Sequence, residues 1–133
     1  MVDALRRAHR AVRRGGFVID ARPDASRVPR VVVGGRVIAR LVQSEDADRR
    51  DAEADAAVAT VIERGLFRSV ERGRVWHRNT VGDMRALDAY VRDSSRYGGY
   101  ERGARARLAR HPRATFVLRR AIKYEVLERL GPG

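Results

Sequence analysis

The stretch Leu5–Arg22, LRRAHRAVRRGGFVIDAR, constrains the fold more than any other part of this 133-residue chain. Leu5, Ala8 and Val12 recur at i, i+3 and i+7, which places them on one face of a helix. Arginines occupy most of the other positions between Leu5 and Arg14. The spacing therefore predicts an amphipathic helix over residues 3–14.

A double glycine and an apolar run follow this helix. Gly15-Gly16 supplies the left-handed residue with which helices often end. The continuous run Phe17-Val18-Ile19 is typical of an interior strand that is covered on both faces, as in parallel sheets. We therefore expect a central, parallel-type strand over residues 17–22, ended by Pro23, which lacks the donor that a sheet requires.

Turn signals and hydrophobic periodicity place the remaining elements. Gly34-Gly35 between β-branched runs predicts a hairpin, because tight hairpin turns need positive φ. The stripe that runs from Ala54 to Ile62 predicts a helix. The elements expected after residue 29 are a hairpin of 30–33 with 36–42, a helix over 46–64, a hairpin of 66–70 with 74–78 turning at Arg72-Gly73, a helix over 83–93, a loop over 94–103 and a short helix over 104–109.

The chain closes on a long period-2 pattern. Apolar residues hold the even positions from Phe116 to Val126, interrupted by Arg120, and this alternation predicts a long strand with one buried face. The whole pattern predicts an α+β fold with a mixed, largely antiparallel sheet and three main helices. We expect residues 1–133 to form a single domain.

Composition excludes several classes of protein. The chain has no cysteine, so disulfides and thiolate chemistry are excluded. No apolar run approaches the length of a membrane span, and the charged N-terminus is not followed by the apolar region of a secretory signal. We therefore expect a cytoplasmic protein without a membrane partner. The three histidines lack the spacing of a metal site, and we expect no metal.

Arginine dominates the charge. The formal net charge is +12, and Lys123 is the single lysine among 29 basic residues. Each end of the chain, 1–43 and 96–133, carries a net +7. Such usage is typical of a GC-rich coding sequence, but clustered arginine also attracts phosphate. With Tyr97 and Tyr100 upstream, these arginines are candidates for contacts to a nucleic acid or another polyanion: Arg102, Arg105, Arg107, Arg110 and Arg113.

The order helix, strand, hairpin, helix, strand pair, helix, long strand, together with LRRAHRAVRRGGFVIDARP, resembles the C-terminal half of a class I S-adenosylmethionine-dependent methyltransferase. The segments AAVATVIERGLF at 56–67 and GDMRALDAYV at 82–91 add to the resemblance, which covers roughly residues 4–130. It implies a Rossmann-like relative. The family's glycine-rich cofactor turn belongs to the other half, so the resemblance assigns this chain no catalytic residue, no cofactor-binding residue and no cofactor.

The resemblance also implies a partner. A methyltransferase-like half without the cofactor site is expected to be non-catalytic alone, as a remnant or a partner subunit. Its exposed sheet edge is expected to form a homodimer or to bind another protein. The alternative function is a small basic nucleic-acid-binding protein.

A small-molecule pocket between the sheet and the 94–103 loop is a third hypothesis. The resemblance places Arg96, Tyr97 and Tyr100 in a region that helps to cover the substrate pocket. Trp76 and His77, on the expected strand pair, are further candidates. The simpler interpretation gives Trp76 to the core or its rim and the loop residues to solvent. The carboxylates at 45–55 are similarly interpreted as the solvent-exposed face of a helix.

Overall fold

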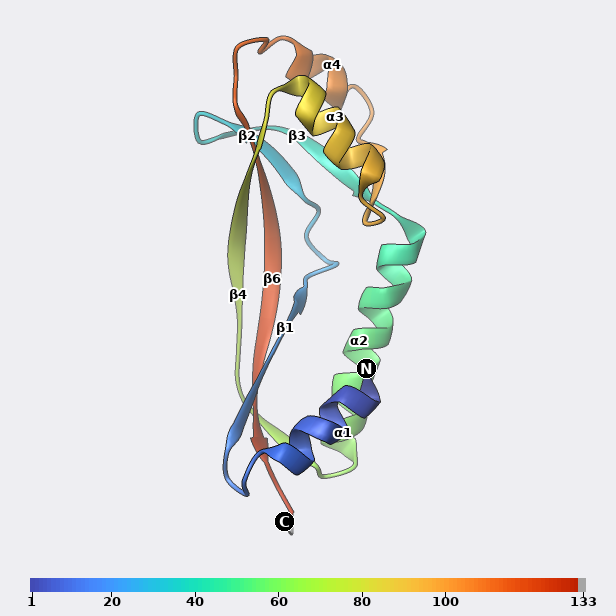
Figure 1. Ribbon diagram of the computed structural model, residues 1–133, viewed down its shortest axis with the longest axis vertical. Coiled ribbons are helices and arrows are strands. Elements are labelled where there is room, and N and C mark those ends of the chain that lie inside the picture. The colour runs from blue at the N-terminus through green and yellow to red at the C-terminus, as the bar shows by residue number, and fades with distance from the viewer. Residues whose placement is uncertain (132–133) are drawn as a thin grey trace. The chain divides into compact units, whose positions relative to one another are not determined.

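The computed structural model describes residues 1–131, which form an α+β structure (Figure 1). Within this range the sheet has six strands and is mostly antiparallel, and α1, α2 and α3 are the longer helices, so the predicted fold class is confirmed. No helix within residues 1–131 combines the length and apolarity needed to cross a membrane. The elements are α1 (Val2–Ala11), β1 (Phe17–Pro23), β2 (Arg30–Val33), β3 (Arg36–Gln43), α2 (Glu45–Glu63), β4 (Phe67–Gly82), α3 (Met84–Asp93), β5 (Tyr97–Tyr100), α4 (Ala104–Ala109) and β6 (Phe116–Arg129).

The long strand β6 organises the sheet. The strand order is β1-β6-β2-β3-β5, and β4 also pairs with β6. β1 pairs antiparallel with the second half of β6, where Pro23 lies opposite Ile122. β2 pairs antiparallel with the first half, where Arg30 lies opposite Arg119.

The described chain groups into two compact units. The first unit contains Met1–Pro23, Arg50–Val75 and the chain from Ile122 onward. The second unit contains Asp24–Arg49 and Trp76–Ala121. The strands β4 and β6 and the helix α2 contribute residues to both units. The single-domain organisation stays a prediction.

In the first unit, α1 and α2 share a core with the strands. The apolar stripe of α2 is buried at Ala57, Val58 and Val61, as its spacing predicts, and packs with Leu5, Phe67 and Leu127. Gly65, at φ 69°, ends α2 in the left-handed region. The helix α1 ends at Ala11, three residues earlier than predicted, because Val12 already has extended backbone (φ −91°, ψ 136°).

In the second unit, α3 and α4 cover one face of β2, β3 and the first half of β6. The Asp83 carboxylate caps α3 by accepting a hydrogen bond of 2.9 Å from the Ala86 amide. Leu87 from α3 and Leu108 from α4 are fully buried. They share one core with Val31, Ala39, Leu41, Phe116 and Leu118.

The first predicted hairpin is confirmed. β2 and β3 pair antiparallel on either side of Gly34 and Gly35, whose φ values are 55° and 79°. Two successive positive φ values define the turn that matches the twist of a two-residue hairpin. The predicted short helix at 104–109 is also present as α4.

The prediction that residues 17–22 form a central, parallel-type strand is wrong, although a strand is present there. β1 is antiparallel to β6 and lies at the end of the strand order, so it is neither central nor parallel. Phe17 and Ile19 are 60% and 70% exposed, whereas Asp20 is buried. An apolar run of three residues does not distinguish a doubly covered strand from an edge strand that exposes alternate side chains.

The hairpin predicted at Arg72-Gly73 does not form. β4 runs without interruption from Phe67 to Gly82. Gly73 is needed for space instead of a turn, because a Cβ there would stand 2.4 Å from the Tyr124 hydroxyl oxygen. A glycine inside a strand often marks such a close approach.

Two smaller expectations also need correction. The segment 94–103 contains the short strand β5, whose Tyr100 lies opposite Leu41 of β3. The single buried face expected for 116–126 does not persist along β6. Burial falls on Phe116 and Leu118 in the second unit, but on odd positions such as Glu125 and Leu127 in the first. Period 2 alone does not reveal such a change of face.

Candidate functional site

Three arginines stand in one line across the sheet of the second unit. Arg30 of β2 lies opposite Arg40 of β3 and, on its other side, opposite Arg119 of β6. We call Arg40, Arg30 and Arg119 the arginine row. Neighbouring strands lie about 5 Å apart, so the row places three cations side by side.

The arginine row lies on the sheet face away from the helices. Val31, Ala39 and Leu118 are buried in the core with α3 and α4. Each is the chain neighbour of a row arginine, and successive residues of a strand point to opposite faces. The row therefore occupies the face that α3 and α4 leave uncovered.

Trp76 of β4 anchors two of the three arginines. The guanidinium carbons of Arg30 and Arg119 each lie 4.8 Å from the centroid of its ring, within the range of a cation–π contact. The Nε atoms of Arg30 and Arg119 are buried and have no hydrogen-bond partner within residues 1–131. Trp76 thus holds both guanidinium groups without neutralising them.

No ion pair within residues 1–131 balances the charge of the row. In the described part of the chain, the three arginines form no ion pair with a carboxylate. Asp48 and Glu101 line a cavity together with Arg40, so two acidic groups lie near the β3 end of the row. Like charges placed directly opposite each other on paired strands destabilise a sheet, so the row carries a cost to folding.

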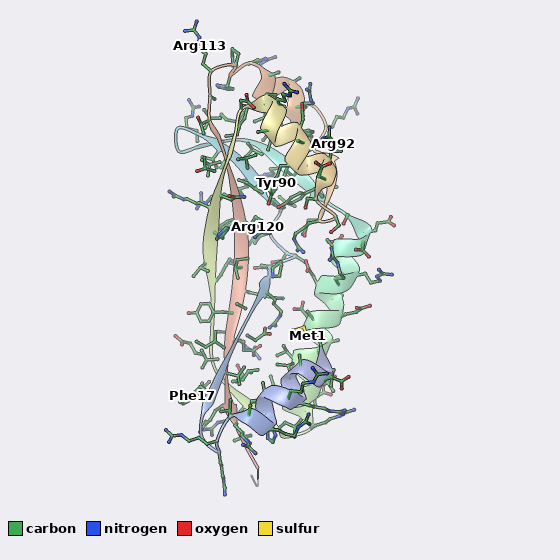
Figure 2. The ribbon with its side chains drawn as sticks, viewed as in Figure 1. Met1, Phe17, Tyr90, Arg92, Arg113 and Arg120 are labelled. Carbon is green, nitrogen blue, oxygen red and sulfur yellow. The ribbon has the colours of Figure 1, made fainter. Side chains whose placement is uncertain are left out.

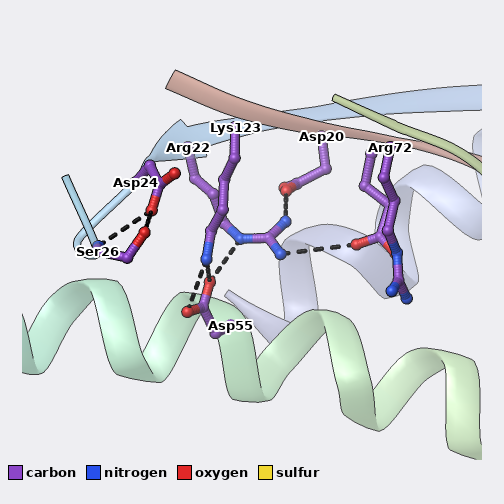
Figure 3. A network of polar contacts seen from close by, with 8 residues as sticks. Asp20, Arg22, Asp24, Ser26, Asp55, Arg72 and Lys123 are labelled. Atoms are coloured by element: carbon purple, nitrogen blue, oxygen red, sulfur yellow. Dashed lines mark hydrogen bonds and ion pairs between the residues drawn. The ribbon is translucent and has the colours of Figure 1, made fainter. Parts of the chain in front are cut away.

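A second polar cluster lies in the first unit, around Arg22 of β1 (Figure 3). The Arg22 Nε donates to Asp55 Oδ1 of α2 at 2.7 Å, and its Nη1 donates to Asp20. Its Nη2 lies 3.6 Å from Glu125 Oε2 of β6. Lys123 Nζ donates to Asp55 Oδ2 at 2.9 Å. Together with Arg72, which donates to Glu125, these residues are called the Arg22 network.

Burial and pairing act against each other in the Arg22 network. Burial lowers the pKa of Arg22, but its hydrogen bonds with Asp55 and Asp20 outweigh this effect and raise the pKa above its ordinary value. Burial raises the pKa of Asp55, but hydrogen bonds from Lys123 and Arg22 outweigh burial and lower this pKa below its ordinary value. For Glu125, hydrogen bonds from Ser69 and Arg72 outweigh burial and lower its pKa. All of these groups therefore stay charged at neutral pH.

The Arg22 network borders a cavity of about 340 Å³, whose remaining walls include Val58, Ala59, Ile62, Gly73 and Tyr124. Its three cations face three carboxylates, so its formal charge is zero. Every cation in it already has a carboxylate partner. Such a network joins α2 to β1 and β6, and β4 to β6, but offers no unpaired cation to a ligand. The arginine row is the stronger candidate site.

The five residues predicted as a pocket lie on β4 and on or next to β5. Trp76 is half-buried against the arginine row, and its neighbour His77 is exposed. Tyr97 belongs to the core of the second unit, and its burial raises its pKa to about 12. The Arg96 Nη2 donates to Gln43 at 3.1 Å. The Tyr100 hydroxyl donates to Asp88 at 2.7 Å.

The basic stretch 102–113 divides into paired and unpaired arginines. Arg105 binds both carboxylate oxygens of Asp88, at 3.0 and 2.6 Å, and its hydrogen bond lowers the pKa of Asp88. The Arg107 Nε donates to the Ile38 carbonyl at 3.2 Å. Arg102 and Arg110 are exposed. The side chain of Arg113 extends away from the ribbon (Figure 2).

Sequence reasoning missed Arg30, Arg40 and Arg119 as site residues. The signal was present in part, because the hairpin at Gly34-Gly35 brings β2 beside β3. The register, however, shifts between Val31 and Val32, so the turn alone does not pair Arg30 with Arg40. The expectation that carboxylates 45–55 all face solvent is also wrong, since Asp51 is buried and Asp55 binds Arg22.

In comparisons with protein-family models, with curated proteins and with solved structures, nothing matches this chain.

Proposed function

We propose that this protein binds single-stranded nucleic acid on the uncovered sheet face of the second unit, through the arginine row. The observation that carries the proposal is the line of Arg40, Arg30 and Arg119, none of which forms an ion pair with a carboxylate within residues 1–131. A phosphate backbone supplies the anions that this face lacks. Guanidinium groups bind phosphate through two parallel hydrogen bonds.

Trp76 favours a single strand over a duplex. Proteins that bind single strands combine a positive surface with aromatic side chains on which bases stack. Sheet faces bearing aromatic residues bind unpaired bases in this way. Here the half-buried indole of Trp76 lies within cation–π distance of two guanidinium groups, so an aromatic ring and two cations stand together on this face.

The only tryptophan of the sequence stands at this face, which makes the test site-specific. Titration of the protein with an unlabelled oligonucleotide of about 12 nucleotides is expected to change the fluorescence of Trp76. Fluorescence anisotropy of the same oligonucleotide, end-labelled, gives the affinity. A single strand is expected to bind more tightly than the matching duplex, and tighter duplex binding would overturn the proposed ligand.

The salt dependence of the affinity measures how many phosphate contacts the protein makes. Each phosphate contact to a single strand contributes about 0.7 to the slope of log affinity against log salt. Three row arginines therefore contribute a slope of about 2. Arg30→Gln and Arg40→Gln are each expected to reduce the slope by about 0.7 and to weaken binding.

Arg64→Gln is the matched control. Arg64 is exposed in the turn that follows α2, in the first unit, and its substitution changes the formal charge equally. If Arg64→Gln weakens binding as much as Arg30→Gln, the affinity reflects total charge and the proposed site is wrong. Arg113→Gln tests the basic stretch 102–113 in the same assay.

A second candidate function is that of a methyltransferase-related subunit that joins a second copy of itself through β1. The observation that favours it is the position of β1 at the end of the strand order, with Phe17 and Ile19 largely exposed. Exposed edge strands readily pair with another chain. The resemblance seen in the sequence supplies the methyltransferase relation, and no catalysis by this chain alone is proposed.

Light scattering coupled to gel filtration tests this second candidate. The protein is expected to be dimeric, and Ile19→Lys is expected to yield monomers, because an edge lysine opposes strand pairing. A wild-type monomer at high concentration contradicts the dimer. Calorimetry with S-adenosylmethionine is expected to show no binding, and micromolar binding would contradict the non-catalytic subunit.

A further inference from the structure

Beside the arginine row, the second unit has a cavity of about 320 Å³. Arg78 and Thr80 of β4 line it from one side, and Arg119 lines it from β6. Val32 and Val117, which lie opposite each other on β2 and β6, also line it. Gly34 and Gly35 complete the lining at the turn of the hairpin. Its volume is near the lower end of the range for small-ligand sites, about 300–1,000 Å³.

Polar and apolar groups combine in this cavity. Arg78 and Arg119 bring two guanidinium groups, and Thr80 adds a hydroxyl donor. No described carboxylate pairs with Arg78 or Arg119, and no acidic residue contributes to the lining. The two valines offer an apolar surface to a sugar or a base. Both glycines have open space where a Cβ would stand, so no side chain closes the hairpin end.

The cavity is continuous with the proposed binding face. Arg119 belongs both to the arginine row and to the cavity lining. On β4, residues 76, 78 and 80 are two positions apart, so their side chains lie on the same face of the sheet. A nucleic-acid strand bound along the row therefore reaches the cavity at the end of the row formed by β6 and β4. The acidic residues Asp48 and Glu101 lie near the opposite end, beside Arg40.

We propose that this cavity binds the terminal nucleotide of the strand through a phosphomonoester, and that Arg78, Arg119 and Thr80 recognise it. This inference rests on the proposed function. A phosphomonoester carries about 1.5 to 2 negative charges near neutral pH and has three acceptor oxygens. A phosphodiester within a strand carries a single charge, so two guanidinium groups and a hydroxyl favour the monoester.

The test compares three oligonucleotides of one sequence, with a 5′ phosphate, with a 3′ phosphate and with no terminal phosphate. Affinities come from anisotropy with an internal label, so both ends stay free. One of the phosphorylated strands is expected to bind about tenfold more tightly than the unphosphorylated strand, since one charge-assisted contact contributes at least this much. The better end gives the polarity of the bound strand.

Two variants assign the preference to the cavity. Thr80→Val keeps the side-chain shape and removes the hydroxyl, and Arg78→Gln removes one guanidinium. Both are expected to reduce the preference for the terminal phosphate to about threefold or less. Arg64→Gln, the charge-matched control, is expected to keep the full preference.

The outcomes separate this inference from the proposed function. If all three oligonucleotides bind the wild type equally and Arg30→Gln still weakens them, the terminal-phosphate site is wrong and the arginine row stands. A preference that survives in both Thr80→Val and Arg78→Gln places the phosphate elsewhere and also overturns the inference. If no oligonucleotide binds and the fluorescence of Trp76 does not change, the proposed function itself has failed.

Discussion

The ring of Tyr124 lies directly over the backbone of Gly73, on the neighbouring strand. A Cβ at residue 73 would stand 2.4 Å from the Tyr124 hydroxyl oxygen and 2.5 Å from its Cζ. These distances are far below van der Waals contact, so any larger residue must displace the ring.

Gly73→Ala is therefore expected to destabilise the protein by about 1–3 kcal/mol, the usual cost of overpacking. Urea unfolding measures the change. Combination with Tyr124→Ala provides the check, because removal of the ring leaves space for the new methyl group. An equal cost of Gly73→Ala in both backgrounds would show that the ring is not the cause.

Arg22→Gln is expected to destabilise the protein by about 3 kcal/mol, because it leaves the buried Asp20 carboxylate without its ion-pair partner and takes one of two cationic neighbours from Glu125. The side chains of Asp20 and Glu125 are 7% and 6% exposed. Arg72→Gln is the matched control on the same network. The Arg72 side chain is 73% exposed, so its loss is expected to cost less than about 1 kcal/mol. Equal costs for the two variants would mean that burial does not govern this network.

The pH dependence of stability follows from the lowered pKa values of Asp55 and Glu125. Their ordinary values are 3.8 and 4.5, and the unfolded chain takes up protons near these values before the folded protein does. The free energy of unfolding is therefore expected to be nearly constant from neutral pH down to about pH 5 and to fall below about pH 4.5. Asp88, whose pKa is also lowered, adds to the same trend.

Chemical denaturation at a series of pH values measures this profile. Asp55→Asn is expected to have a shallower acid decline than the wild type, since it removes one of the groups with a lowered pKa. A stability that rises on acidification would contradict the proposed origin of these shifts.

Arg40→Gln is expected to stabilise the fold by about 0.5 kcal/mol, because it removes one of the like charges paired across neighbouring strands. The gain is expected to shrink at high salt, where exposed charges are screened. Thermal unfolding at low and high salt checks both points. Arg113→Gln, on a loop, is expected to leave stability unchanged. If Arg40→Gln instead lowers stability, repulsion between the arginines of the row does not destabilise the fold.

Local pattern predicted the local elements of this fold. The stripe from Ala54 to Ile62 and the pair Gly34-Gly35 determine their own structures, because spacing along the chain sets which residues share a helix face or form a turn. Gly73 failed as a turn signal because its role depends on Tyr124, which is distant in the sequence. The apolar run at Phe17 failed because burial depends on which strand lies beside it.

The candidate site was harder to predict than the fold. Trp76 was singled out from its residue type, but its arginine partners come from two other strands. Arg30 and Arg119 are 89 positions apart in the numbering, and only strand register brings them together. The stretch 102–113 attracted attention because its arginines are close in sequence, yet Arg105 and Arg107 already have protein partners.

The stacking of Arg30 and Arg119 on Trp76 has a consequence for the thermodynamics of binding. A free arginine side chain has about 2 kcal/mol of rotamer entropy, part of which is lost when it binds a ligand. The indole ring has already restricted both side chains in the free protein, so much of that entropy is lost during folding. Association with an anion should consequently show a smaller entropic penalty at Arg30 and Arg119 than at the exposed Arg40.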